Sequence, residues 1–373
     1  MAFLRRHRGK LIASLLITGG IWYTLRKGGL KIVPEGGDFQ HVRWWTVPVY
    51  VVALFVYSWF RSVRWRFLLR SIADVPKKRL FIVSCVGFAA IVILPFRIGE
   101  VVRPYMIRTP ESDRRPGEKP VTMTAATSSV VAERVIDGLY LSIVLALALF
   151  LVPTVHPLPE TVVGLPVSVA SVRMAGYGML ALFLAASVTI AVFYFARAWA
   201  HKMTLKVFGK VSTRLAERLA TLCEKFADGL HVLGRGRDAL GFLAETSAYW
   251  LVNAVSMCFL AWGCGVVHAD GTGPTFGEAC ALMGMLGCAI FIPGPPGALG
   301  AFQAGIYAAM TMYYPTAVVV GPGAAFIFLM YTSQVVFTLA AGAIALGVSG
   351  RVGARGLRAI ERADAIVGEP ADA

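Results

Sequence analysis

Long apolar runs without charge, separated by short polar segments, dominate the chain. Three of them, each 22 or 23 residues long and free of Asp, Glu, Lys and Arg, are Gly138 to Pro159, Met174 to Ala196 and Thr246 to Val267. A helix of that length spans the hydrocarbon core of a bilayer. A fourth run, Ala279 to Gly350, has 72 residues without Asp, Glu, Lys, Arg or His, so it holds more than one membrane segment. The pattern predicts an all-α polytopic membrane protein.

The basic residues orient these segments, because Lys and Arg concentrate in cytoplasmic loops. Stretches rich in Lys and Arg alternate with loops that have none, such as 153–171 and 266–275. The basic stretches, which are expected in the cytoplasm, are 5–10, 61–79, 197–237 and 351–362. This alternation predicts six full transmembrane helices and places both termini in the cytoplasm. The expected helices cover about 11–27, 44–60, 121–152, 172–197, 241–265 and 324–347.

Two further segments are expected to enter the membrane and turn back. The uncharged run Leu80 to Phe96 has basic sequence on both sides, and a full crossing would put the four Lys or Arg residues of 108–119 outside. A re-entrant hairpin from the cytoplasm avoids that. Pro293-Gly294-Pro295-Pro296-Gly297 interrupts the 72-residue run and predicts a second hairpin, which enters from outside.

The order of these elements predicts an inverted repeat. Helix, hairpin and helix follow one another over roughly 44–152 and again over roughly 241–347, starting from opposite sides of the membrane. In many transporters such halves meet near the bilayer midplane, where their broken segments form the substrate site. The domain organisation is therefore one membrane domain, 1–350, with a cytoplasmic amphipathic helix at about 203–235, followed by a basic cytoplasmic tail, 351–373.

Composition supports the membrane assignment and narrows the function. The chain is 57% hydrophobic and only 15% charged, with a mean hydropathy of +0.67. The net charge of +15 could suggest a nucleic-acid-binding protein, but the basic residues lie between apolar runs rather than along one soluble face. The six cysteines form no CxxC motif. We expect no nucleic-acid partner, no metal and no cofactor.

Six ionisable residues lie where a bilayer disfavours them. Arg97, Glu100 and Arg103 follow the first hairpin run, and Glu133, Arg134 and Asp137 lie inside the next apolar stretch. One charge near the bilayer centre costs about 2.5–3.5 kcal/mol, so six unpaired charges would cost on the order of 15–20 kcal/mol. Their formal charges sum to zero, which predicts that the two clusters neutralise each other in one protein-lined cavity.

The spacing of these residues suggests a site for phosphate. Arg97, Glu100 and Arg103 are three apart, so a helical turn stacks them, and two guanidiniums around one carboxylate keep donors free for phosphate oxygens. Glu133 and Asp137 are four apart and share a helix face. They are either counter-charges that an anionic headgroup displaces or part of a fixed salt-bridge network that holds the first hairpin.

Neutral residues complete the predicted substrate site. Gly297 and Gly300 form the second break, where irregular backbone at membrane depth must be satisfied by protein or a wet cavity. Polar side chains in or after the hairpins could bind a headgroup, or they could instead join neighbouring helices. These are Tyr105, Gln303, Tyr331 and Gln334.

Three motifs in order resemble the flippase-like membrane domain family, which includes the transmembrane part of lysylphosphatidylglycerol synthases. They are Arg97-x-Gly-Glu100-x-x-Arg103-Pro104, Glu133-Arg134-x-x-Asp137, and a Pro-Gly-rich turn followed by Gly297-Ala298-Leu299-Gly300-Ala301-Phe302-Gln303. The resemblance covers about 11–347. Members often have an acidic residue after the last motif, where this chain has Gln303.

The resemblance implies a lipid translocase of the bacterial cytoplasmic (inner) membrane, not an enzyme. Its substrate would be a phospholipid or a polyprenyl-linked lipid, and a homo-oligomer or a separate lipid-modifying enzyme could be its protein partner. Arg97 and Arg103 would hold the headgroup phosphate, with Glu133 and Asp137 as counter-charges. Two alternatives stay open: an intramembrane transferase acting on a lipid-linked donor, and an ion-coupled transporter of a soluble solute.

Overall fold

The computed structural model describes residues 30–70, 73–108, 121–157, 159–162, 168–208, 236–290 and 296–348, with a few isolated positions beyond them. The expected helix at 11–27, most of the amphipathic segment 203–235 and the tail 351–373 lie outside these ranges. The long helices are α3 (Thr46–Val63), α5 (Lys77–Ile93), α7 (Met123–Leu151), α8 (Val169–Phe195), α11 (Gly236–Gly263), α12 (Phe276–Ile290) and α15 (Pro322–Val348).

The shorter elements connect or interrupt the long ones. They are η1 (Gly36–Phe39), α4 (Trp65–Leu69), η2 (Pro95–Val101), α6 (Val102–Ile107), α9 (Arg197–Phe208), η5 (Pro296–Ala298), α13 (Ala301–Met310) and α14 (Thr316–Val320).

Five of the predicted transmembrane segments form helices at their expected places, namely α3, α7, α8, α11 and α15. Among the described residues, four helical stretches are long and apolar enough to cross a membrane: Thr46–Leu69, Met123–Leu151, Val169–Thr189 and Thr316–Val348. Helix α11 is 28 residues long but contains polar side chains such as Thr246 and Asn253, and it is not among those four. The protein is thus an all-helical, multi-pass membrane protein.

Both predicted hairpins contain a helix, a break and a second helix packed on the first. In the first, α5 contacts η2 and α6; in the second, α12 contacts α13. The two breaks share a short pattern, Pro-x-x-aliphatic-Gly, at 95–99 and at 296–300. Its third residue is in the left-handed region in both cases, with φ 58° at Arg97 and 54° at Ala298. The two breaks therefore have related local sequence and backbone.

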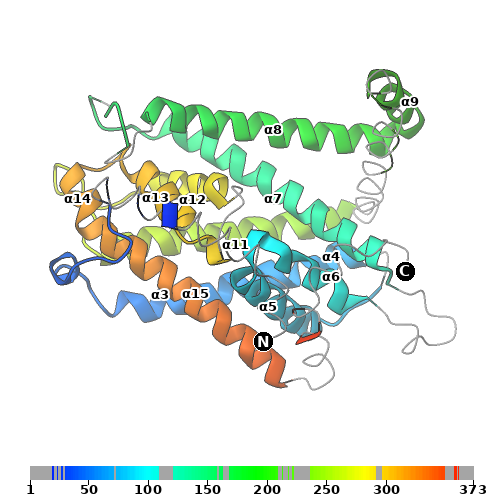
Figure 1. The fold of residues 1–373 in the computed structure, drawn as a ribbon, viewed down its shortest axis with the longest axis horizontal. Coiled ribbons are helices and arrows are strands. Elements are labelled where there is room, and N and C mark those ends of the chain that lie inside the picture. Colours follow the sequence, from blue (N-terminus) through cyan, green and yellow to red (C-terminus); the bar gives the residue numbers. More distant parts are fainter. Residues whose placement is uncertain are drawn as a thin grey trace.

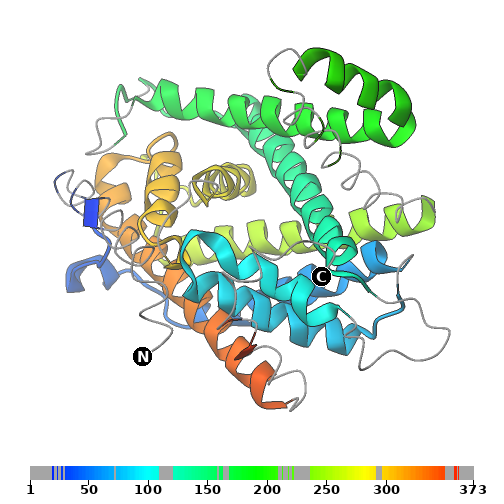
Figure 2. The same ribbon diagram turned by 45° about the vertical axis from the view of Figure 1, so that its right-hand side comes forward.

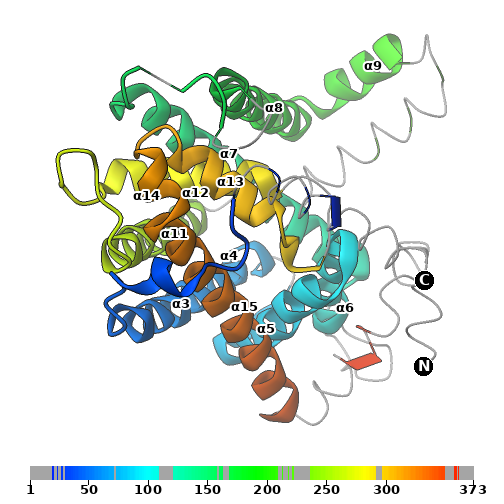
Figure 3. The ribbon, with the colours of Figure 1, turned by 60° about the vertical axis from the view of Figure 1, so that its left-hand side comes forward.

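The two halves of the chain exchange contacts (Figures 1 and 2). Helix α3 packs along α11, the first arm α5 packs against α15, and the first arm α12 packs against α7. Each hairpin thus lies against the last helix of the other half. Helices α3, α5 and α15 also pack against one another, as Figure 3 shows.

Helix α8 lies at one edge of the molecule (Figure 1), where it packs mainly on α7. Much of its remaining surface is apolar and exposed, including Met174, Leu182 and Val188. A continuous exposed apolar face on a long helix is suited to contact with lipid chains.

The segment 30–45 packs over α13 of the second hairpin and over α15. The Tyr307 hydroxyl donates a hydrogen bond to the carbonyl of Lys31, and Phe39 packs on Phe328. The Lys31 ammonium donates to the Asp38 carboxylate, and this bond raises the pKa of Lys31. The two carboxylates of this segment, Glu35 and Asp38, are both within ion-pair distance of Lys31.

Helix α15 can approach α5 closely because residue 342 has no side chain. A Cβ at Gly342 would overlap the Cβ of Ala89 on α5, whereas a Cβ at Gly347, on the same helix, would meet nothing within 4 Å. We expect Gly342→Ala to destabilise the protein by about 1–3 kcal/mol through overpacking. Gly347→Ala should leave stability unchanged or slightly higher, since alanine favours helix. Thermal unfolding of both variants in the same detergent tests this, and equal melting temperatures would contradict the close contact.

Candidate functional site

A buried ion-pair network joins the first half of the chain to α11. Arg64, between α3 and α4, donates from Nη2 to Glu133 Oε1 at 3.1 Å and to Asp137 Oδ2 at 2.6 Å. Its Nη1 donates to Thr246 Oγ1 at 2.8 Å. Arg103 on α6 donates to both oxygens of Glu133, each at 3.2 Å. The side chains of Arg64, Arg103 and Glu133 are fully buried and that of Asp137 is 8% exposed, so two cations and two carboxylates balance one another largely away from solvent.

Aromatic rings line this network. The Arg103 guanidinium lies 4.3 Å from the ring centre of Trp65, and that of Arg64 lies 4.5 Å from Tyr249. The Tyr249 hydroxyl donates to Asp137 Oδ1 at 2.6 Å. Both Asp137 oxygens are therefore occupied, one by Tyr249 and one by Arg64. Cation–π contacts and short hydrogen bonds of this kind stabilise charges that have lost their water.

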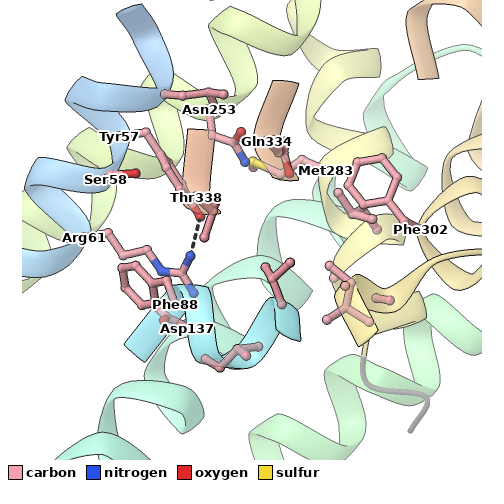
Figure 4. Close-up of a pocket in the computed structure, with 18 of the residues that line it drawn as sticks. Tyr57, Ser58, Arg61, Phe88, Asp137, Asn253, Met283, Phe302, Gln334 and Thr338 are labelled. Atoms are coloured by element: carbon pink, nitrogen blue, oxygen red, sulfur yellow. Dashed lines mark hydrogen bonds between the residues drawn. The ribbon is translucent and has the colours of Figure 1, made fainter. Parts of the chain in front are cut away.

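Beside the network lies a cavity of about 280 Å³ whose walls come from α3, α5, α7, α11, α12, α13, α15 and both hairpin breaks. Arg61, Arg97, Arg134 and Asp137 are its charged lining residues. Figure 4 shows Arg61, Phe88 and Asp137 gathered at one side, with Phe302 and Met283 across from them. The cavity is mostly apolar and contains an excess of arginine, which is the composition expected of a site for an anion attached to a hydrophobic body.

Arg97 lies where the two breaks meet. Its Nε donates to Glu100 Oε1 at 2.9 Å, and its Nη1 points at the carbonyl of Ile290, the last residue of α12, at 3.4 Å. A non-glycine residue with φ near +60° is strained by about 1–2 kcal/mol. Such strain persists where the surroundings enforce it and is frequent at functional sites.

The structure separates the charges that the sequence pattern grouped together. Arg97 and Glu100 pair as expected, because a 3₁₀ turn eclipses residues three apart. Arg103 does not flank Glu100: the chain becomes α-helical at Val102, which rotates Arg103 toward Glu133 instead. The nearest other cation to Glu100 is Arg134, with 3.8 Å between Nε and Oε1. The predicted stack of two guanidiniums around Glu100 is therefore wrong.

The predicted site residues divide into two sets. Those that line the cavity are Arg97, Arg134, Asp137, Gly297, Tyr331 and Gln334. Those that do not are Glu100, Arg103, Tyr105, Glu133, Gly300 and Gln303.

The neutral polar side chains in both sets contact neighbouring residues. Gln303 Oε1 accepts from the backbone N–H of Gly300 and caps α13, and the ring of Tyr105 lies under the Arg108 guanidinium. Gln334 donates to the Tyr50 hydroxyl, while Tyr331 packs on Phe302. Gln303 and Tyr105 thus stabilise the hairpin arms rather than face the cavity.

Sequence reasoning missed Arg61 and Arg64, which it assigned to the cytoplasmic basic segment after the second helix. Arg61 donates to the Tyr57 hydroxyl at 3.2 Å, the bond drawn in Figure 4, and its guanidinium lies 4.2 Å from the ring centre of Phe88. The helical spacing could have placed Arg61 on the inward face of its helix. Residues three and four apart share one face, and this face carries Leu54, Tyr57, Ser58 and Arg61, which all line the cavity.

Arg61 and Arg64 thus join the six predicted charges, and the prediction that the cluster has no net charge is wrong. Five guanidiniums now surround three carboxylates among the described residues, and Arg61 has no ion pair there.

Comparison with known proteins gives one match. A family model described as the lysylphosphatidylglycerol synthase TM region matches residues 10–342, nearly the whole chain. No curated protein and no solved structure matches the chain.

Proposed function

Because the chain belongs to the lysylphosphatidylglycerol synthase TM-region family, we propose that it is a lipid translocase. The headgroup of a membrane lipid would pass through the arginine-lined cavity while the lipid tails stay in hydrocarbon. The observation that carries this proposal is the cavity itself: both hairpin breaks contribute to its wall, and three guanidiniums line it beside mostly apolar side chains.

In this proposal Arg97 and Arg134 contact the headgroup phosphate. Arginine suits the role because its planar fork can donate two parallel hydrogen bonds to phosphate oxygens. Arg103 has a different part: both of its terminal nitrogens already bond Glu133, so it keeps the hairpin arm on α7. Glu100 holds Arg97, and Asp137 at the cavity wall is the counter-charge that an entering anion faces.

The two hairpins would act as opposed re-entrant elements of an inverted repeat. The shared Pro-x-x-aliphatic-Gly breaks and the exchanged packing of α5 on α15 and α12 on α7 support this arrangement. Rocking of one half against the other would expose the cavity to each side of the membrane in turn, as in other inverted-repeat transporters. The contacts of α5 with η2 and α6, and of α12 with α13, would let each hairpin move as a unit.

Translocation can be measured in reconstituted vesicles with acyl-labelled fluorescent lipids and a membrane-impermeant quencher. We expect the protein to move labelled phosphatidylglycerol or labelled phosphatidic acid faster than protein-free vesicles do. Arg97→Gln and Arg134→Gln each remove a charged hydrogen-bond donor, which contributes about 1.5–3 kcal/mol. The rate should therefore fall by about tenfold or more.

Arg70→Gln is the matched control for these variants. Arg70 also pairs with a carboxylate, Asp238, but its side chain is 49% exposed and does not line the cavity. Its substitution should leave the rate unchanged. Folded Arg97→Gln and Arg134→Gln proteins that keep the wild-type rate, or a wild type that moves neither lipid, would refute the proposal.

A further inference from the structure

The arginines around the cavity outnumber the carboxylates. Two of the five arginines, Arg64 and Arg103, form ion pairs with Glu133 and Asp137 inside the buried network. Neither of them lines the cavity. Glu100 is left as the only other carboxylate of the cluster, and it bonds Arg97. Within the part of the chain that the structure describes, the cavity therefore faces two positive charges without a counter-charge.

These two charges belong to Arg61 and Arg134. The polar partner of Arg61 is the Tyr57 hydroxyl, which is neutral. Arg134 approaches Glu100 and Asp137 only at 3.8 and 3.9 Å, and its buried Nε and Nη2 atoms have no hydrogen-bond partner. Buried guanidinium nitrogens without acceptors are costly, and an anion in the cavity beside Arg134 would offset the charge that the protein leaves uncompensated. Arg61, Arg97 and Arg134 all line the same cavity, so one ligand can reach them together.

Among the described residues, the same wall offers no free carboxylate to an ammonium group. Asp137 is its one carboxylate, and both of its oxygens are occupied, by Tyr249 and by Arg64. A headgroup that carries amines, such as an aminoacyl ester or ethanolamine, would add positive charge beside three arginines. The electrostatics thus favour a headgroup with two negative charges and no cation.

We infer that the cavity selects the headgroup of a lipid phosphomonoester over that of a phosphodiester or an aminoacylated lipid; this inference rests on the proposed translocase function. A phosphomonoester carries about −1.5 to −2 at pH 7 and has three terminal oxygens, whereas a phosphodiester carries a single charge. Three terminal oxygens match three guanidiniums. The apolar remainder of the lining, which includes Leu54, Trp250 and Leu286, lies beside the arginines and suits the attached hydrocarbon.

Two kinds of lipid share this chemistry, phosphatidic acid and polyprenyl monophosphate, and binding experiments can separate them. The purified protein in nanodiscs would be titrated with each, with phosphatidylglycerol, with lysylphosphatidylglycerol and with inorganic phosphate. Intrinsic tryptophan fluorescence can report binding, because Trp250 lines the cavity. We expect at least one phosphomonoester lipid to bind about tenfold or more tightly than phosphatidylglycerol, a difference that one added charged hydrogen bond can supply.

The pH dependence gives a second readout. Affinity for the phosphomonoester should rise between pH 5 and pH 8, because its second ionisation has a pKa of about 6. Affinity for phosphatidylglycerol, which has no ionisation in that range, should not follow it.

Arg61→Gln removes the cavity arginine that has no ion pair among the described residues. It should reduce the preference for the phosphomonoester about tenfold while changing phosphatidylglycerol binding little. Arg70→Gln should leave the preference intact. If Arg61→Gln does not fold, the lipid selectivity and the pH profile of the wild-type protein are sufficient to test the inference.

Equal or tighter binding of phosphatidylglycerol or lysylphosphatidylglycerol would overturn the inference, and so would an unchanged preference in folded Arg61→Gln. Inorganic phosphate that competes as well as the lipids would overturn it too, in favour of a soluble anion. Selective binding without translocation would instead refute the translocase proposal and leave the specificity standing.

Discussion

Arg64→Met should lower the free energy of unfolding by about 3–5 kcal/mol, since it leaves two buried carboxylates without their shared cation. The Arg64 side chain is fully buried, bonds Glu133, Asp137 and Thr246, and lies between the rings of Phe242 and Tyr249. Methionine fills much of the same volume, so the loss comes mainly from charge rather than from a void. Titration with a denaturing detergent, followed by tryptophan fluorescence, would measure it.

A second substitution separates charge from packing. Asp137→Asn removes one of the two negative charges that Arg64→Met leaves behind, so the double variant should regain part of the lost stability. Arg70→Met is the control: it also removes a cation from a buried carboxylate, Asp238, but the Arg70 side chain is 49% exposed and water can reach the site, so the loss of stability should be clearly smaller. Arg64→Met that is as stable as Arg70→Met would mean that the buried network does not hold α3, α7 and α11 together.

Gly99→Ala should open the first hairpin. A Cβ at residue 99 would overlap the backbone of Ala90 and Ile91 on α5, and backbone cannot move aside as the end of a side chain can. We expect a loss of stability of about 1–3 kcal/mol or more from this overlap. Because Gly99 lies between Arg97 and Glu100, the same displacement should move the Arg97 guanidinium away from the carbonyl of Ile290.

The paired readouts are thermal unfolding and lipid translocation, measured on the same preparation. Gly178→Ala on α8 is the matched control, since a Cβ there meets nothing within 4 Å, and it should behave as the wild type does. If Gly99→Ala keeps both the stability and the translocation rate of the wild type, the close approach of residue 99 to α5 matters for neither property.

Much of the fold could be predicted because the bilayer leaves few choices. An uncharged run of 20 residues must satisfy its backbone internally, so it becomes a helix, and its end is marked where charge or proline returns. The helix at 322–348 follows that rule throughout, and those at 46–63, 123–151, 169–195 and 236–263 extend an uncharged run past a few charged residues. The helix–break–helix units were predictable for a related reason, since clusters of proline and glycine cannot continue a helix.

The site could be predicted only in part. The sequence identified Arg97, Glu133, Arg134 and Asp137 as charges in need of partners, because ionisable residues are rare in apolar segments. It could not say which charge meets which. Arg61 and Arg64 follow an apolar run as cytoplasmic anchors do, and only the packing of α3 on α11 and of α4 on α7 brings Arg64 onto Glu133.

By itself the sequence determined that this protein is a multi-pass helical membrane protein with two interrupted segments and a set of buried charges. Hydrocarbon imposes these features residue by residue, through length, polarity and the positions of proline and glycine. The tertiary structure alone decided the pairing: Arg103 with Glu133, Arg64 with Glu133 and Asp137, and Arg61, Arg97 and Arg134 left at the cavity wall. Electrostatic partners depend on distances of a few ångströms between segments far apart in the chain, and helix packing sets those distances.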